Sequence, residues 1–484
     1  MTATSAAPAD GFTIVVKRDC QTCVMVEPVL QQLARSGLKV AILSQDDPTF
    51  PGGAGTVVDD RDLVQSWEMK IETVPTVIRM EGGQETARAI GWDRAEWEAL
   101  IGVGQLGPGL PNQRPGCGSM TTDPNIADAL ALKLGNFTFK ARQIEIGAYE
   151  DEHEAAFDRG WSDGLPVVPP TPVRVWRMLA GTKRDPHEVL GQMPPDYEAV
   201  TVEKVAINAV MAGCRPEYMP VLLAAVEAVL DDGFCLHGVI ATTMYIGPIV
   251  IVNGPARKAI GMNAGINVLG QGNRANSTIG RALQLAIRNI GGGKPGEIDR
   301  ATLGNPGKVG FCFAENEDVS SWEPLSVERG VPAGQSAVTL YAGYGVQGII
   351  DQTSRTAESL VASFAAALKA VYHPKSFPGP DAFLVMAPDH HRVFREAGWD
   401  KARFKAEIGR LTMVDADDVL IGKDGMLPGV SPKLAGTRVE KLRPGGFNVV
   451  VAGGAAGLFS GILPGWSPGL NDVNSQVVTR VVGD

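Results

Sequence analysis

The chain of 484 residues lacks the features of proteins that bind nucleic acids or cross membranes. It has no cluster of lysine and arginine, and its formal net charge is −10. Nucleic acids and anionic membranes attract clustered basic side chains, so neither is expected as a partner. It also has no uninterrupted apolar run of about 18 residues, the length that a membrane helix needs, and no basic start followed by an apolar stretch. These absences predict a cytoplasmic protein.

Cysteine is scarce, with 6 residues in the whole chain, which excludes a disulfide scaffold. In a reducing compartment such cysteines are catalytic, metal-ligating or buried. No second closely spaced Cys or His pair completes a zinc motif, so no metal site and no cofactor is predicted. A metal ion held by cysteines of the C-terminal part (Cys214, Cys235, Cys312) stays open as an alternative. With 44% hydrophobic residues, the chain can form two or three domains with large cores.

Cys20 and Cys23 form a C-x-x-C pair between an apolar run and a segment with helical character. The run, residues 12–16, is typical of a buried strand. A helix N-terminus offers unpaired N–H groups and a partial positive charge, which favour a thiolate. The pair is therefore predicted to be a redox-active dithiol.

The surroundings of this pair resemble the thioredoxin fold. Pro28 lies within the helical segment, and Val74-Pro75-Thr76 precedes a strand-like run. The resemblance implies that Pro28 bends the first helix and that a cis-Pro loop at Pro75 packs beside the dithiol. The predicted order is strand 12–16, helix 20–36, strand 39–44, helix 60–69, strands 76–80 and 85–89, and helix 93–102.

Glycine and proline are dense between residues 105 and 125, a segment without periodicity that also contains Cys117. We therefore predict a thioredoxin-like domain over residues 1–104, a linker over 105–125 and a larger catalytic domain over 126–484. The larger domain is expected to be a glycine-rich α/β domain with a mixed or parallel sheet, because its helical patterns alternate with short apolar runs. The helices are predicted at 148–160, 172–181, 201–213, 216–231, 276–290, 354–371 and 389–407, and the strands at 247–253, 309–314, 336–342, 382–387 and 447–452.

Cys214 is the first candidate for a second reactive thiol, and Cys117 is the second. Cys214 lies between two predicted helices and beside Arg215, an environment that lowers the pKa of a thiol. The alternative interpretation is that Cys214 is a small buried apolar residue.

A glycine-rich loop, residues 270–274, opens the predicted helix 276–290. Such a loop can bind an anion, with arginines supplying charge, or it can be a simple turn with a helix cap; both interpretations stay open. Nearby asparagines offer neutral donors and acceptors for a polar substrate, and glutamates offer acid–base groups. The predicted substrate-binding residues are Asn253, Asn273, Arg274, Asn276, Arg281, Glu315 and Asn316.

Several segments of the larger domain resemble a bacterial family associated with UGSC (seleno)proteins, whose members are often labelled thiol-disulfide oxidoreductases. They are residues 161–172, 207–218, 252–255, 272–276 and 313–317. Gly116-Cys117-Gly118-Ser119 is similar to the Sec/Cys-Gly-Ser-Cys signature of that family, with Met120 in the last position. The resemblance implies a bacterial oxidoreductase.

Together these features predict a thiol-dependent oxidoreductase in which the dithiol domain exchanges electrons or thiols with a cysteine site that binds a small-molecule substrate. An external thiol or reductase would return the electrons. One alternative is a redox-neutral lyase or hydrolase of a sulfur-, metal- or halogen-bearing small molecule, with the dithiol domain as an accessory. A binding or chaperone-like module is another. A homo-oligomer is possible, and the oligomeric state stays open.

Overall fold

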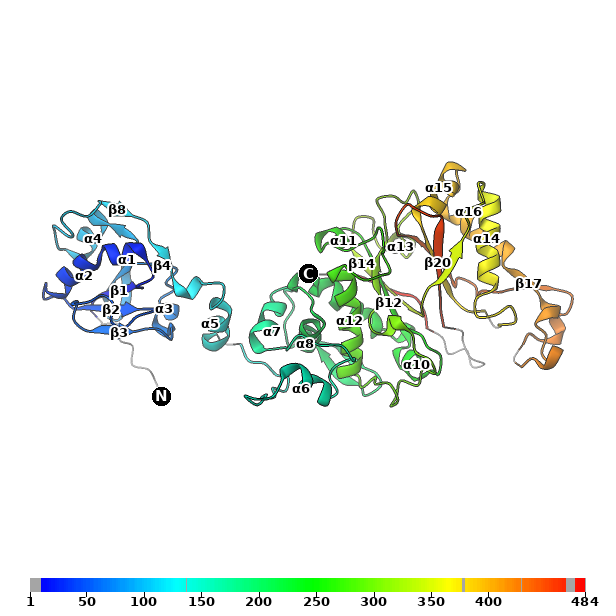
Figure 1. The fold of residues 1–484 in the computed structure, drawn as a ribbon, viewed down its shortest axis with the longest axis horizontal. Coiled ribbons are helices and arrows are strands. Elements are labelled where there is room, and N and C mark those ends of the chain that lie inside the picture. The colour runs from blue at the N-terminus through cyan, green and yellow to red at the C-terminus, as the bar shows by residue number, and fades with distance from the viewer. Residues whose placement is uncertain (1–9, 136, 377–378, 428, 467–474, 484) are drawn as a thin grey trace. The chain divides into compact units, whose positions relative to one another are not determined.

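The computed structural model describes residues 10–135, 137–376, 379–427, 429–466 and 475–483 (Figure 1). Internal contacts divide the chain into two compact units, residues 1–138 and 139–484. Both units combine helices with sheets, so the α/β class predicted from the sequence is confirmed. None of the helices within the described ranges is both long and apolar enough to cross a membrane.

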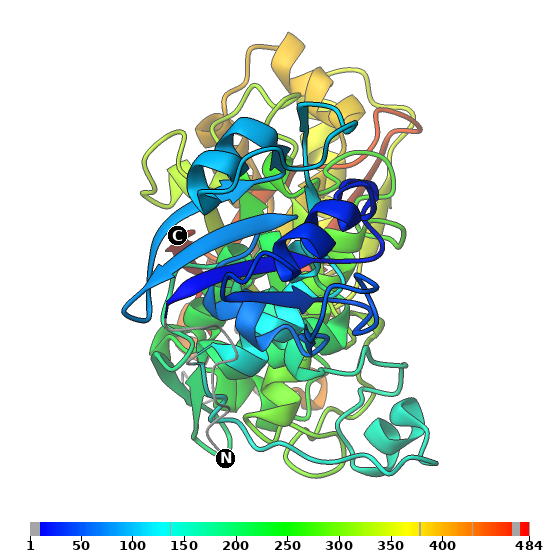
Figure 2. The ribbon, with the colours of Figure 1, turned by 90° about the vertical axis from the view of Figure 1, so that its left-hand side faces the viewer.

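Unit 1 is built on a five-stranded sheet in the order β3-β2-β1-β5-β6. β1, β2 and β3 are parallel to one another. β5 is antiparallel to β1, and β6 is antiparallel to β5. Figure 2 shows these strands side by side in blue and light blue. The strands β4 and β7 are each two residues long. The bounds are β1 (Gly11–Val16), β2 (Val40–Ser44), β3 (Val57–Asp59), β4 (Thr73–Val74), β5 (Thr76–Glu81), β6 (Gln84–Ile90) and β7 (Trp92–Asp93).

The helices of unit 1 follow the predicted order, with one break. The segment predicted as a single helix over 20–36 forms two helices that separate at Val26, because Pro28 in the first turn of the second helix has no N–H to donate. Asp93 caps α4 by accepting a hydrogen bond from the Glu96 N–H. The bounds are α1 (Gln21–Met25), α2 (Glu27–Ala34), α3 (Val64–Glu68), α4 (Arg94–Ile101) and α5 (Ala127–Leu134).

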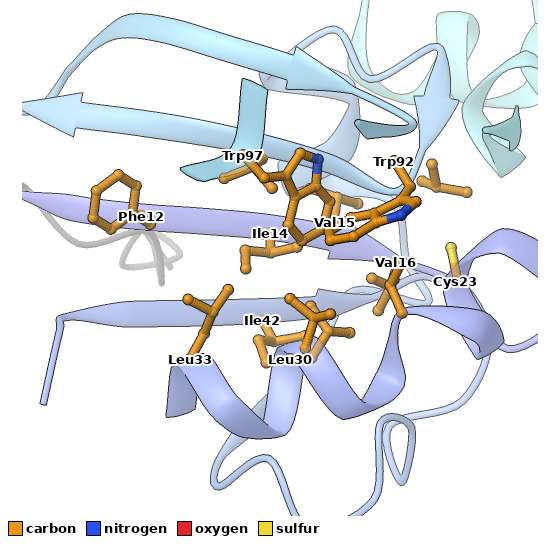
Figure 3. Close-up of a cluster of buried hydrophobic side chains, with 14 of the residues drawn as sticks. Phe12, Ile14, Val15, Val16, Cys23, Leu30, Leu33, Ile42, Trp92 and Trp97 are labelled. Carbon is orange, nitrogen blue, oxygen red and sulfur yellow. The ribbon is translucent and has the colours of Figure 1, made fainter. Parts of the chain in front are cut away.

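An apolar core fills the space between the sheet and the helices of unit 1 (Figure 3). The rings of Trp92 and Trp97 lie edge to face with centroids 5.1 Å apart, and the Trp97 indole N–H donates to the Gly91 carbonyl. Cys23 belongs to this core and is labelled at its edge in Figure 3. The β1 strand therefore ends where the core meets the dithiol.

Residues 105–125 differ from the linker predicted from their glycines and prolines. They belong to unit 1, where they form β8 (Gln113–Arg114), β9 (Cys117–Gly118) and a 3₁₀ turn, η1 (Met120–Thr122). β8 pairs with β7 and β9 pairs with β4. At Gly116 the missing side chain allows close backbone approach to Val74. We call residues 113–118 the strap.

Unit 2 contains two mixed four-stranded sheets, in the orders β13-β12-β14-β21 and β15-β20-β16-β19. β12 is parallel to β13, β16 is parallel to β19, and the other neighbours are antiparallel. Every predicted strand of this unit is present in one of these sheets. Two-stranded ribbons supplement them. The bounds are β10 (Val189–Met193), β11 (Glu198–Thr201), β12 (Gly247–Asn253), β13 (Cys312–Ala314), β14 (Ala337–Gly343), β15 (Gln347–Ile350), β16 (Ala382–Met386), β17 (Met413–Asp415), β18 (Arg438–Glu440), β19 (Phe447–Val451), β20 (Phe459–Pro464) and β21 (Val478–Val481).

Every helix predicted in unit 2 is present, except that the one predicted over 389–407 is two helices, and the short helices 236–241, 256–259 and 325–328 are not predicted from the sequence. Gly398, with φ +70°, ends the first, and Asp400 caps the second. The bounds are α6 (Glu152–Asp158), α7 (Pro172–Leu179), α8 (Val202–Ala212), α9 (Met219–Val229), α10 (Leu236–Ala241), α11 (Ala256–Ala259), α12 (Arg274–Asn289), α13 (Leu325–Glu328), α14 (Ala357–Lys369), α15 (Pro388–Glu396) and α16 (Lys401–Leu411).

One apolar cluster of unit 2 includes side chains of both sheets. Ile251 and Tyr341 belong to the first sheet, and Phe383 and Val450 belong to the second. The Tyr341 and Phe383 rings lie 4.6 Å apart between centroids. Strands β12, apart from its last residue Asn253, and β16 are apolar and buried on both faces, which explains why their sequences show continuous rather than alternating hydrophobicity.

Candidate functional site

Cys20 lies between the end of β1 and the first turn of α1, at the N-cap position of that helix. Its backbone is extended, with φ −143° and ψ 111°, and its Sγ accepts a hydrogen bond from the Cys23 N–H at 3.3 Å. The sulfur therefore takes the place that a Ser or Asp oxygen has at an ordinary N-cap. A thiolate at this position satisfies a backbone donor and interacts favourably with the positive end of the helix.

The two thiols of the pair have opposite pKa shifts. Hydrogen bonding from the Cys23 side chain, supported by that of Cys117 and by backbone N–H groups, lowers the pKa of Cys20 to about 5 against the opposing effect of burial. Burial and the neighbouring Cys20 raise the pKa of Cys23 well above its ordinary value. At neutral pH the Cys20 thiol is thus ionised, while Cys23 holds a proton beside it.

Pro75 is placed beside the dithiol, as the thioredoxin resemblance implies. The Val74–Pro75 peptide bond is cis. When protonated, the Cys20 thiol donates a hydrogen bond to the Val74 carbonyl at 3.5 Å. The β4 segment that carries this carbonyl therefore forms one wall of the site.

Cys117 is a third thiol of the same site. In the β4–β9 pair, Cys117 lies opposite Val74, whose carbonyl contacts Cys20. Cys117 helps to lower the pKa of Cys20, while burial and the Cys20 thiolate raise the pKa of Cys117. Cys117 is partly exposed, whereas Cys20 and Cys23 are 2% and 0% exposed. The sequence indicated Cys117 as a candidate but gave no sign that it joins the dithiol.

Cys214 is buried rather than poised for reaction. Its side chain donates to the Thr278 carbonyl at 3.4 Å, and burial raises its pKa to about 12. The lowered pKa expected from the sequence is therefore corrected. The reason is burial of the sulfur, which outweighs the lowering influences of its hydrogen bond to Thr278 and of the Arg274 charge. Cys214 also precedes a short 3₁₀ turn rather than an α-helix. Burial also raises the pKa of Cys312.

The residues predicted around the N-terminus of α12 are held by protein partners. Asn273 caps α12 by accepting from the Asn276 N–H, and the Asn276 amide is hydrogen-bonded to the backbone of Asn263. Arg281 forms a two-point ion pair with Asp163, each bond 2.8 Å long. These contacts match the turn-and-cap interpretation, because the donors expected to bind an anion are already engaged.

Asn253 and Glu315 meet at the ends of β12 and β13. The Asn253 Nδ2 donates to Glu315 Oε2 at 2.7 Å, and Glu315 also accepts from the Leu325 N–H. Burial raises the pKa of the Glu315 carboxyl. The neighbouring Asn316 uses its N–H to donate to the Val451 carbonyl, so its backbone has a structural role.

A pocket of about 280 Å³ opens beside this pair, lined in part by Gly254, Arg257, Glu317 and Ser326. Arg257 is 6% exposed and its guanidinium contacts Glu317 and Asp318. Sequence reasoning missed Arg257, although a basic residue just after a fully apolar strand is a signal that could have indicated it. Within the described ranges, no group of three or more His, Cys, Asp or Glu side chains is arranged to hold a metal ion.

Comparison with known proteins supports a thioredoxin-like region and nothing more specific. The chain is 31% identical over 83 residues to Thioredoxin H2-1 of Oryza sativa subsp. japonica, an alignment that covers 17% of this chain and 51% of the relative. The chain thus spans about half the length of the curated relative it matches. No model of a known protein family matches the chain. No solved structure matches it either.

Proposed function

We propose that the protein is a thiol–disulfide oxidoreductase in which Cys20 is the attacking sulfur and Cys23 the resolving sulfur. The observation that carries the proposal is the Cys20 Sγ at the N-cap of α1, bonded to the Cys23 N–H, with a pKa lowered to about 5. Its high thiolate fraction at neutral pH favours attack on a substrate disulfide.

The exchange conserves electrons at each step. The Cys20 thiolate attacks one sulfur of a substrate disulfide, forming a mixed disulfide and releasing a substrate thiolate that takes up a proton. Cys23 then loses its proton and attacks the Cys20 Sγ, which releases the second substrate thiol and leaves the Cys20–Cys23 disulfide. An external thiol or reductase supplies the two electrons that restore the dithiol.

The second part of the proposal is that unit 2 binds a small-molecule substrate. The pocket next to the buried Asn253–Glu315 pair supports this assignment, because it combines a concave surface with charged and amide groups. Cys214 is a weaker candidate for a second exchanging thiol, since it is buried and its pKa is raised to about 12. The same burial favours the alternative of a redox-neutral lyase or hydrolase in unit 2, with the dithiol unit as an accessory.

Disulfide mapping tests the proposal. The full-length protein is equilibrated with mixtures of reduced and oxidised glutathione, remaining thiols are alkylated, and peptides are identified by mass spectrometry. We expect a Cys20–Cys23 disulfide to form, while Cys214 and Cys312 stay reduced and are alkylated only after denaturation, because burial raises the pKa of both thiols and keeps them protonated. Failure of Cys20 and Cys23 to pair under any mixture would contradict the proposal and favour the redox-neutral alternative.

A further inference from the structure

The dithiol is covered, which poses a problem for exchange with another molecule. Attack on a disulfide requires the incoming sulfur to reach one of the two bonded sulfurs. Cys20 is 2% exposed and Cys23 is fully buried. An external thiol therefore has no open approach to Cys23 and only a narrow one to Cys20.

The cover is the strap, residues 113–118, which is fixed on both sides of the dithiol. The Thr22 hydroxyl donates to the Pro115 carbonyl at 2.7 Å, and Arg114 donates to the Gln21 side chain at 2.8 Å. At Gly116 the backbones approach so closely that an added Cβ would lie 2.6 Å from the Val74 carbonyl oxygen. The strap is thus an ordered part of the site.

Cys117 is the sulfur that connects the covered dithiol with the surface. It belongs to the strap, is partly exposed, and lies opposite Val74, whose carbonyl accepts from the Cys20 thiol. Among the three thiols of unit 1, it alone is partly exposed.

From this arrangement we infer that Cys117 is a relay thiol, through which external dithiols reduce the Cys20–Cys23 disulfide. The inference rests on the proposed function. In the first step the Cys117 thiolate attacks the Cys20 Sγ, so that a Cys20–Cys117 disulfide forms, the Cys20–Cys23 bond breaks, and Cys23 leaves and takes up a proton. This exchange within the protein needs no oxidant or reductant. The disulfide now includes the Cys117 sulfur, which solvent reaches.

In the second step an external dithiol attacks the Cys117 Sγ and expels Cys20. Cys20 is the favoured leaving group because its thiolate is stabilised at the N-cap of α1. The second thiol of the external molecule then attacks the mixed disulfide and releases Cys117. The external dithiol is oxidised by two electrons, and the protein regains three thiols.

The charges around Cys117 favour this order of events. In the reduced protein, burial raises the pKa of Cys117, and the Cys20 thiolate raises it further through hydrogen bonding and charge repulsion, while the Thr22 N–H and Lys17 lower it. Formation of the Cys20–Cys23 disulfide removes the negative charge on Cys20. Burial and the two lowering influences remain, so the pKa of Cys117 falls relative to the reduced protein and Cys117 ionises more readily when there is a disulfide for it to attack.

A rate measurement on full-length protein tests the relay. Oxidised wild type, Cys117→Ser and Cys235→Ser are mixed with a reduced thioredoxin as the external dithiol, and loss of the Cys20–Cys23 disulfide is followed by quenching and peptide mass. We expect the disulfide of the Cys117→Ser variant to be reduced at a rate about 10-fold or more below that of wild type, because the direct approach to Cys20 is covered. Cys235→Ser is the matched control: the same change at another partly exposed cysteine should keep the wild-type rate.

A second variant gives an independent readout. In Cys23→Ser, oxidation with glutathione should yield a Cys20–Cys117 disulfide. A wild-type rate for Cys117→Ser, or a glutathione adduct on Cys20 of Cys23→Ser in place of that bond, would overturn the relay. If wild-type protein forms no Cys20–Cys23 disulfide, the proposed function itself fails. If Cys117→Ser disturbs folding, Cys117→Ala is measured in its place.

Discussion

Full-length protein carrying Cys20→Ser is expected to lose at least about 1000-fold in the rate of disulfide reduction, because the activated nucleophile is removed. Cys23 cannot replace it: its side chain is fully buried and its pKa is raised by burial and by its neighbour. The measurement is turnover of insulin disulfides with dithiothreitol as electron source, compared with wild type at equal concentration.

Two controls show whether the loss is chemical. The Cys235→Ser variant, changed in unit 2, should keep the wild-type rate. Cys23→Ser should lose turnover and still show alkylation of Cys20, because the attacking sulfur remains. Residual turnover by Cys20→Ser within 10-fold of wild type would contradict the assignment of Cys20 as nucleophile.

Replacing Gly116 with alanine is expected to displace the strap and expose Cys20. An added Cβ would lie 2.4 Å from the Thr73 Cγ2 and 2.6 Å from the Val74 carbonyl oxygen, and the backbone carbonyl cannot move away without disturbing the β4–β9 pair. Overpacking of this kind costs about 1–3 kcal/mol of folding free energy. Alkylation of Cys20 in the native protein should accelerate about 10-fold or more, since thiol reactivity depends on access.

The matched control is Gly118→Ala, two residues further along the chain. There the nearest atom to an added Cβ, the Thr122 Oγ1, lies 3.8 Å away, an ordinary contact. This variant should keep both the stability and the alkylation rate of wild type. Equal alkylation rates for Gly116→Ala and wild type would show that the strap does not limit access to Cys20.

Local signals in the sequence were sufficient to predict most elements of both units. The apolar run before Cys20 predicts β1, the C-x-x-C pair predicts the N-cap, and Pro28 and Pro75 have the positions that the thioredoxin resemblance implies. These features depend on residues close together in the chain, which is why pattern reasoning finds them.

The strap could not be predicted, because its strands are two residues long and have no periodicity. Its glycines and prolines are equally typical of a flexible linker. Only the pairing with β7, at least twenty residues earlier in the chain, and with β4, more than forty residues earlier, shows that the segment is packed rather than flexible. The place of Cys117 in the site follows from that pairing.

Tertiary contacts also determine whether the residues predicted as site residues in unit 2 are available to a ligand. Arg281 is a plausible anion ligand in sequence, but its partner Asp163 lies 118 residues away in the chain and takes up its charge. Cys214 has basic neighbours in sequence, yet packing buries its sulfur against Thr278. Periodicity and spacing give no information about contacts between residues so far apart in the chain.

The pH dependence of Cys20 alkylation tests the central claim most directly. Full-length reduced protein is treated with iodoacetamide at a series of pH values, and modification of the Cys20 peptide is followed by mass spectrometry. A pKa lowered in the folded protein means that the thiolate fraction, and with it the rate, rises with a midpoint near pH 5 and is constant above about pH 7. A midpoint near 9.0, the ordinary value of a cysteine thiol, would show that Cys20 is not an activated nucleophile.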